Sequence, residues 1–219
     1  MTPQELKNSI LQLAVQGKLV EQRAEEGTGE ELYQEIQKEK ARLIKIGKIK
    51  KAKPLPEITD EEIPFDIPEG WKWLRFGNVS QLLDGEKRTG YALPCLDAKY
   101  LRGKTAPTIH TDGKFVAKGT KIILVDGENS GEVFIAPEDG YSGSTFKILY
   151  YSDILCEKYV LFYLLFHKED YRNNKRGAAI PHLDKNLFFG MPFPLPPLAE
   201  QKRIVAKIEE LLPLCEKLK

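Results

Sequence analysis

Hydrophobic residues recur every three or four positions near both ends of this 219-residue chain. Leu6, Ile10 and Leu13 follow this spacing near the N-terminus, and residues 197–219 continue it over a longer stretch. The spacing is typical of amphipathic helices whose apolar seams pair as in coiled coils. The C-terminal seam consists of Ile204, Ile208, Leu211, Cys215 and Leu218.

An apolar seam of this kind needs a partner helix. Full burial of each side chain is worth roughly 1.5 to 3 kcal/mol before discounting, so the seam favours burial over exposure. We expect it to pack against the same seam of a second copy, in an antiparallel coiled coil with twofold symmetry. The alternative is that the helix folds back on its own domain. The predicted dimer interface consists of Leu6, Ile10, Leu13, Ile204, Ile208, Leu211, Cys215 and Leu218.

Local signals place the ends of the terminal helices. Thr2, Pro3 and Glu5 provide an N-cap, a proline at the first helical position and a capping-box partner, and Gly17 ends the first helix. Pro213 falls inside the last helix, where its missing N–H and its ring predict a kink or a break.

Residues 30–46 predict a further helix, with Leu32, Ile36, Leu43 and Ile46 on one face. The stretch that follows, "KIGKIKKAK", holds five lysines in nine residues. It is interpreted either as a solvated helix end that complements the helix dipole, or as a contact for phosphate or a partner.

The prolines and acids of "PLPEITDEEIP" (54–64) predict an extended linker, after which the pattern changes to strands and turns. β-Branched and aromatic residues between glycines predict strands at 70–79, 121–128, 131–137 and 145–151, and helical patterns occur near 156–170 and 183–188. Four prolines, Pro192, Pro194, Pro196 and Pro197, argue against regular structure before the last helix. The fold class is therefore α+β: a globular mixed α/β domain at 54–196, flanked by long amphipathic helices within 1–53 and 197–219.

Composition excludes several classes of protein. The longest dense apolar run, "YVLFYLLF" at 159–166, is far shorter than the about 20 residues of a membrane span. The N-terminal residues have no signal-peptide layout, so we expect a cytoplasmic protein with no membrane partner. The three cysteines are scattered, which predicts neither a disulfide framework nor a metal site. A net charge of +1 means that any DNA-binding surface is a local patch.

Motifs for catalysis are sparse. The chain has no F-x-G-x-G or N-P-P-Y pattern of a methyltransferase and no phosphate-binding G-x-x-x-x-G-K-[ST] loop. Asp84 with Asp97 and Lys99 has roughly the layout of a metal-dependent nuclease, which we keep as a minor alternative. The stretch "LDAKYLRGK" (96–104) is better interpreted as a strand and turn that offers cations to DNA.

Several segments carry a resemblance to a known family. "IPEGWKWLRFGNV" (67–79), "PLPPLAEQKRIVAKIEEL" (194–211), "LQLAVQGKLV" (11–20) and "EKARLIKIGKIKKAKPLP" (39–56) resemble the conserved regions of the DNA-specificity subunit of type I restriction-modification systems. The segment from about 80 to 190 resembles the variable target-recognition domain of that family. Family members usually carry two such domains, and this chain carries one, as a half-subunit would.

The resemblance implies a binding role. A specificity subunit reads a split DNA target, and one recognition domain reads one half. It also provides a scaffold for a methyltransferase subunit, which uses S-adenosylmethionine, and a restriction and translocase subunit, which uses ATP and Mg²⁺. The chain itself is then expected to be non-catalytic and to hold no cofactor. A second copy would supply the other half of the target. The alternatives are a stand-alone dimeric DNA-binding regulator and a scaffold that binds protein only.

Side-chain chemistry selects the candidate DNA contacts. Lysine and arginine suit phosphates, whereas Arg, Asn, Gln, Ser and Thr suit base edges. These residues gather in "GEKRTGY" (85–91), in "GENSG" and "GYSGST" (127–131 and 140–145), and in "YRNNKRGAAIPHL" (171–183). The alternative for each loop is an ordinary polar turn. The predicted DNA-binding residues are Lys87, Arg88, Thr89, Tyr91, Lys99, Arg102, Lys104, Asn129, Ser130, Ser144, Arg172, Asn173, Asn174, Lys175, Arg176 and His182.

Overall fold

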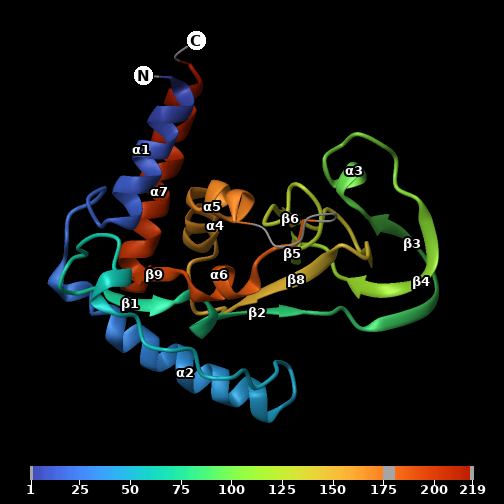
Figure 1. Ribbon diagram of the computed structural model, residues 1–219, viewed down its shortest axis with the longest axis horizontal. Coiled ribbons are helices and arrows are strands. Elements are labelled where there is room, and N and C mark those ends of the chain that lie inside the picture. Colours follow the sequence, from blue (N-terminus) through green and yellow to red (C-terminus); the bar gives the residue numbers. More distant parts are fainter. Residues whose placement is uncertain (1, 175–180, 218–219) are drawn as a thin grey trace. The chain divides into compact units, whose positions relative to one another are not determined.

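The computed structural model describes residues 2–174 and 181–217 and divides the chain into two compact units (Figure 1). The helical unit comprises Met1–Val79, Ser152–His167 and Phe189–Lys219, and the sheet unit comprises Ser80–Tyr151 and Lys168–Phe188. The expected α+β class is confirmed. The predicted domain at 54–196 is not one compact piece, because its entry, its main helix and its exit belong to the helical unit.

The helical unit contains the longest helices of the described chain. Its elements are α1 (Pro3–Val15), α2 (Gly29–Lys45), β1 (Lys72–Arg75), α4 (Glu157–Phe166), β9 (Pro192–Leu195) and α7 (Leu198–Glu216), with short 3-10 turns at Ala24–Glu26, Asp60–Glu62 and Phe76–Asn78.

Helix α1 begins as predicted. The Thr2 side chain accepts a hydrogen bond from the Glu5 backbone N–H at 3.2 Å, and the Glu5 carboxylate accepts one from the Thr2 N–H at 2.7 Å. Gly17, with φ of 70°, follows the helix end in a left-handed conformation that favours glycine. The capping box and the glycine stop therefore act as local signals.

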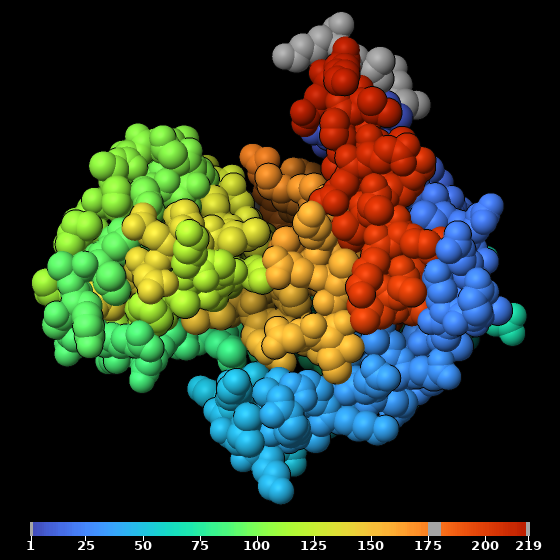
Figure 2. All heavy atoms as spheres, turned by 180° about the vertical axis from the view of Figure 1, so that it is seen from behind, coloured from blue at the N-terminus to red at the C-terminus, as the bar shows by residue number. Residues whose placement is uncertain are grey.

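Helices α1 and α7 pack side by side in antiparallel orientation within one chain (Figures 1 and 2). Lys7 at the start of α1 forms a 3.0 Å ion pair with Glu216 at the end of α7. Ile204, Ile208 and Cys215 are at most 1% exposed without any second chain. The expectation that this seam needs a second copy is therefore wrong for these residues, and the alternative of a helix folding back is confirmed.

Of the remaining predicted interface residues, Ile10 is also buried within the chain, at 7% exposed. Leu6 and Leu211 are partly exposed, and Leu218 lies outside the described residues. Leu13 is 40% exposed because α1 buries the adjacent face formed by Ile10, Leu11, Ala14 and Val15.

Two further expectations about the helices need correction. Helix α7 continues through Pro213, so the predicted break does not occur. Pro213 is exposed, so its ring lies away from the packed side of the helix. In α2, Leu32, Ile36 and Leu43 are buried as predicted, whereas Ile46 is 53% exposed because the helix ends one residue earlier.

The proline-rich segment before α7 forms a strand, contrary to the prediction. Strand β9 pairs antiparallel with β1 in a two-stranded ribbon, with Trp73 opposite Pro194. The Tyr159 hydroxyl donates to the Pro194 carbonyl at 2.9 Å, and the Tyr163 hydroxyl donates to the Pro192 carbonyl at 3.1 Å. The prolines therefore lie along the free edge of the ribbon, where no ladder N–H is needed.

Glu200 and Gln201, in the first turn of α7, are buried polar residues that join distant parts of the helical unit. The Glu200 carboxylate accepts hydrogen bonds from Trp71 Nε1 at 2.9 Å and from Gln22 Nε2 at 2.7 Å. Gln201 accepts one from the Cys156 backbone N–H at 3.0 Å. Because buried polar groups must be paired, these contacts fix the relative positions of four segments of the unit.

Arg75 fixes the extended linker in a similar way. Its buried guanidinium donates to the carbonyls of Pro56, Glu57 and Gly190 at 2.6 to 2.8 Å. It also forms a 2.8 Å ion pair with Glu62. The linker has few hydrogen bonds of its own, so Arg75 holds it in one path.

The sheet unit consists of a four-stranded sheet in the order β2-β8-β5-β6 and a small closed sheet of β3, β4 and β7. Its buried core includes Leu96, Val116, Ile122, Leu124 and Phe146. The elements are β2 (Ser80–Leu83), β3 (Lys87–Leu96), α3 (Ala98–Leu101), β4 (Ile109–Val116), β5 (Lys121–Leu124), β6 (Val133–Ile135), β7 (Gly140–Ser142), β8 (Phe146–Tyr151), α5 (Lys168–Asn173) and α6 (Lys185–Gly190), whose last two residues belong to the helical unit.

The described residues include no helix long and apolar enough to cross a membrane.

The pH dependence of stability is expected to report on Glu200. Burial raises the pKa of Glu200 above its ordinary 4.5. The folded protein therefore binds this proton more tightly, so the contribution is fully present below about pH 4.5 and is lost as pH rises through the raised pKa. Glu200→Gln should weaken that decline in urea unfolding measured across this range. Glu25→Gln, at an exposed position of the same unit, should not, and equal profiles for both variants would contradict the assignment.

The ion pair of Glu62 predicts the opposite trend. The Arg75 guanidinium lowers the pKa of Glu62 from its ordinary 4.5 to about 2. Its contribution to stability is fully present above about pH 4.5 and is lost as pH falls towards 2. Glu62→Gln should lower stability at neutral pH and leave a shallower loss in acid, measured by urea unfolding. Glu61→Gln is the neighbouring control, and an acid profile of Glu62→Gln identical to that of the unmodified chain would rule out the coupling.

Candidate nucleic-acid interface

Every predicted DNA-binding residue that the structure describes belongs to the sheet unit. Lys87, Arg88, Thr89 and Tyr91 lie in strand β3 rather than in the predicted turn. Strands β3 and β4 pair antiparallel along an exposed ribbon, and their register shifts between Thr89 and Leu93. Figure 2 shows these strands (green) as part of the exposed surface of the sheet unit. A strand forms here because β4 offers a pairing partner that is distant in sequence.

Arg88 is held in place on this ribbon. Its guanidinium lies 3.7 Å from the centre of the Phe115 ring and forms a 3.0 Å ion pair with Glu86. A cation over an aromatic face is attracted to the ring and keeps its charge exposed. These contacts therefore orient the Arg88 side chain and leave its charge exposed at the surface.

The segment after β3 is a short helix, not the predicted strand and turn. The Asp97 carboxylate accepts hydrogen bonds from the N–H groups of Lys99 and Tyr100 at 2.8 and 2.9 Å, which caps α3. Lys99 and Lys104 are exposed, in agreement with a role at a surface. Arg102 instead pairs with Glu132 and is partly buried, which makes it a structural residue first.

Ser130 does not fit its predicted role. It is only 3% exposed, and its hydroxyl has no hydrogen-bond partner among the described residues. DNA cannot reach it without a local rearrangement, so we remove it from the candidate set. Asn129 and Ser144 are exposed.

The third predicted loop is described only in part. Arg172 and Asn173 lie in exposed positions of α5, with Arg172 3.8 Å from Glu169, and Asn174 follows. The His182 ring lies 2.6 Å from the Asp126 carboxylate. Lys175 and Arg176 lie outside the described residues.

Backbone hydrogen bonds bring several predicted loops together. The Gly143 N–H donates to the Leu96 carbonyl next to the cap of α3, at 3.3 Å. The Val125 N–H donates to the Thr145 carbonyl at 2.8 Å, and the Gly127 N–H donates to the Pro181 carbonyl at 2.7 Å. These hydrogen bonds connect the segments that carry five exposed residues. We name this group the loop face: Lys99, Lys104, Asn129, Ser144 and His182.

The ribbon residues form a second group. Lys87 is nine positions from Leu96 along β3, or roughly 30 Å at about 3.3 Å per residue. Lys87, Arg88, Thr89 and Tyr91 therefore lie towards the far end of β3 from α3, and the predicted set divides into two clusters.

Sequence analysis missed the other strand of the ribbon. His110 and Thr111 are exposed in β4 and Ile109 is 58% exposed, while the predicted Tyr91 of the paired strand β3 is 64% exposed. The signal was present as β-branched and polar residues in 108–112, but no glycine-flanked loop drew attention to it. An exposed histidine, threonine and aromatic ring suit contacts to bases and sugars.

The two carboxylates of the minor nuclease alternative have structural contacts. Asp84 accepts contacts from Lys114 and Lys147, and the Lys114 hydrogen bond is the largest cause that lowers the pKa of Asp84 to about 2. Asp97 caps α3. Among the residues that the structure describes, no group of three or more His, Cys, Asp or Glu side chains is arranged to hold a metal ion.

Comparison with known proteins identifies relatives over nearly the whole chain. The Type I restriction enzyme EcoAI specificity subunit of Escherichia coli is 33% identical over 241 residues, which cover 98% of this chain and 40% of that protein. The EcoEI specificity subunit of Escherichia coli is 30% identical, with 97% and 40% covered. The MjaVIII specificity subunit of Methanocaldococcus jannaschii is 34% identical, with 65% and 36% covered. The chain thus spans about two fifths of the length of the curated relatives it matches.

Solved structures support the fold. A chain from "Structural basis underlying complex assembly and conformational transition of the type I R-M system" matches with a TM-score of 0.55 and 23% identity, covering 87% of this chain and 48% of that chain. The HsdS subunit from Thermoanaerobacter tengcongensis matches with a TM-score of 0.51 and 23% identity, covering 85% and 47%. Residues 68–218 match the family described as "Type I restriction modification DNA specificity domain". The family match and the curated relatives agree, and the chain belongs to the DNA-specificity family of type I restriction-modification systems.

Proposed function

We propose that this chain recognises one half of a bipartite DNA target as a specificity subunit of a type I restriction-modification complex. The loop face carries the proposal, because it gathers lysines with asparagine, serine and histidine on one family-matched unit. Lysines suit phosphates, and the neutral polar side chains suit base edges. The β3–β4 ribbon adds a second exposed cationic group.

The same proposal assigns chemistry to other chains. The specificity subunit is non-catalytic and scaffolds a methyltransferase subunit and a restriction and translocase subunit. S-adenosylmethionine, ATP and Mg²⁺ are bound and used by those partner subunits. A cytoplasmic location belongs to the proposal, since a recognition subunit must meet the DNA that its complex modifies or cuts.

A second copy would supply the other half of the target. The proposal rests on the bipartite target, of which one recognition segment of the matched family reads one half. The buried α1–α7 seam no longer argues for it. A stand-alone DNA-binding regulator is the second candidate, favoured by the exposed ribbon alone, and it would bind DNA tightly without a methyltransferase subunit.

Substitutions on the loop face should separate phosphate contacts from base contacts. Lys99→Ala with Lys104→Ala should weaken binding to any duplex and reduce the slope of log K against log salt by nearly two, at about 0.9 per phosphate. Asn129→Ala should cost about 1–3 kcal/mol on the cognate site only. Both are measured by fluorescence anisotropy with selected and random duplexes, using the protein assembled with its methyltransferase subunit.

Lys38→Ala, at an exposed position of α2 in the helical unit, is the charge-matched control and should change neither quantity. Equal losses for Lys38→Ala and the loop-face pair would contradict the proposed surface.

Selection from random DNA should reveal how many copies act together. Two identical copies related by a twofold axis read identical, inverted half-sites, so the selected sequence should be an interrupted palindrome. Native mass spectrometry of the assembled complex should then count two specificity chains. A continuous or asymmetric motif, or a single specificity chain in the complex, would reject the homodimer.

A further inference from the structure

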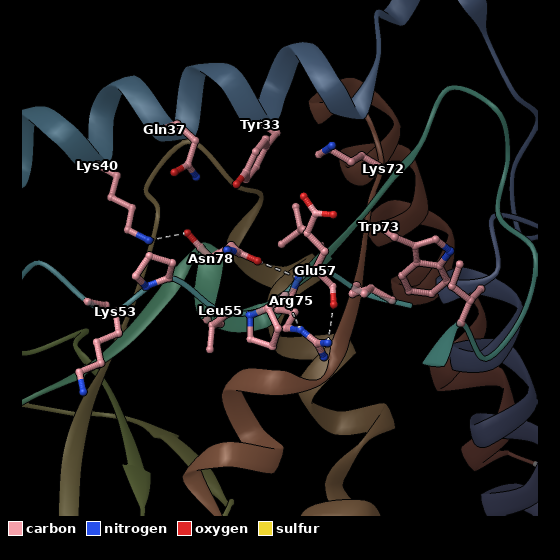
Figure 3. A pocket seen from close by; sticks show the side chains of 17 residues that line it. Tyr33, Gln37, Lys40, Lys53, Leu55, Glu57, Lys72, Trp73, Arg75 and Asn78 are labelled. Carbon is pink, nitrogen blue, oxygen red and sulfur yellow. Dashed lines mark hydrogen bonds between the residues drawn. The ribbon is translucent and has the colours of Figure 1, made fainter. Parts of the chain in front are cut away.

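A cavity of about 630 Å³ lies within the helical unit, and none of its lining residues is assigned to DNA (Figure 3). Helix α2 forms one side of the cavity. The other side is formed by residues 52–58, which include the start of the linker, and by residues 72–78. The lysine-rich stretch at 45–53 leads into its edge at Ala52 and Lys53. The proposed function uses none of these groups.

The α2 side of the cavity presents hydrogen-bond donors. Figure 3 shows Tyr33, Gln37 and Lys40 pointing from the helix towards the linker. Gln37 Nε2 is buried and has no acceptor among the described residues. A buried amide without a partner costs free energy that an incoming acceptor would recover. The site therefore lacks an acceptor.

The positive charge of Lys40 indicates that the missing acceptor is anionic. Its ammonium group donates to the Asn78 carbonyl at 2.9 Å and has no ion pair within the described ranges 2–174 and 181–217. Burial lowers the pKa of Lys40, because a neutral carbonyl compensates only part of the lost hydration. A carboxylate beside Lys40 would supply the charge that its surroundings lack.

The other charges of the cavity are mostly neutralised. Lys72 pairs with Glu30 at 2.6 Å, and Arg75 pairs with Glu62 at 2.8 Å. Lys40 and Lys53 thus face one lining acid, Glu57, and the exposed lysines at 48 and 51 adjoin them along the chain. The balance is cationic and favours an acidic ligand.

The linker side supplies the apolar part of the cavity lining. Leu55, Ile58, Trp73 and Leu74 line it, and Arg75 holds the linker through backbone carbonyls. A sugar-phosphate backbone has no large apolar group to bury against this surface, whereas a peptide can bury an apolar side chain there. The two sides together fit a ligand that carries both a carboxylate and an apolar group.

We propose that this cavity docks an acidic peptide segment of a partner polypeptide. Its carboxylate lies between Gln37 and Lys40, and an adjacent apolar side chain packs on Leu55 (Figure 3). Lys53 and the preceding lysines attract the flanking acids. The inference names the chemistry of a partner contact and holds whichever DNA sequence the sheet unit reads.

Peptide display against the full chain tests the proposal. Libraries of extended peptides should enrich sequences that pair Asp or Glu with a neighbouring large apolar residue. A synthetic peptide of the enriched sequence should protect residues 33–40 and 53–58 from hydrogen exchange. Enrichment without an acid, no enrichment at all, or protection elsewhere would each overturn the proposal.

Substitutions then test the two key donors. Lys40→Met and Gln37→Leu should each weaken the peptide by about tenfold or more, as expected for loss of a hydrogen bond to a charged group. Lys40→Arg should restore most of the affinity. Lys53→Gln, at an exposed site, should weaken the peptide less. Lys38→Met, on the exposed side of α2, should leave the peptide affinity unchanged.

A duplex and inorganic phosphate serve as competing probes. Protection of residues 33–40 by either of them, equal to that by the peptide, would assign the cavity to phosphate and overturn the peptide. The peptide measurements use the chain without DNA, so a failure here is distinguishable from a failure of the DNA-reading function.

Discussion

The buried hydrogen bonds of Glu200 and Gln201 are the constraint on which the helical unit depends. These two neighbours take donors from Trp71, Gln22 and Cys156, which lie far apart in the sequence. A buried carboxylate without its donors would cost far more than these bonds contribute, so the segments must meet in this arrangement. Trp71, Glu200 and Gln201 belong to two of the motifs that carry the family resemblance, which gives that part of the resemblance a physical meaning.

That constraint also decides the role of the terminal helices. Once the start of α7 is fixed beside Gln22, α1 is positioned to run back along α7, and the apolar faces of the two helices bury each other. Surface that would otherwise draw in a second copy is already used, apart from exposed residues such as Leu13 and Leu214. Any association between copies must therefore rely on surfaces other than the main seam.

The two units differ in which side chains they bury and which they leave exposed. The helical unit buries charged and polar groups, Arg75 and Glu200 among them, to fix extended segments that have few hydrogen bonds of their own. The sheet unit closes around a small apolar core and leaves its ribbon and loops exposed. Loops on a fixed scaffold can vary without loss of the core, which suits the proposed DNA-reading surface.

The sequence by itself determined the features that act within about four residues. These include the capping box at Thr2, the helix of α2, the strands rich in β-branched residues and the exposure of most candidate DNA contacts. Only the tertiary structure decided which helix fills the α7 seam, that Pro192 and Pro194 lie on a free strand edge, and that Arg102 and Ser130 serve the interior. The physical reason is that pairing and burial depend on residues far along the chain, which a local pattern does not identify.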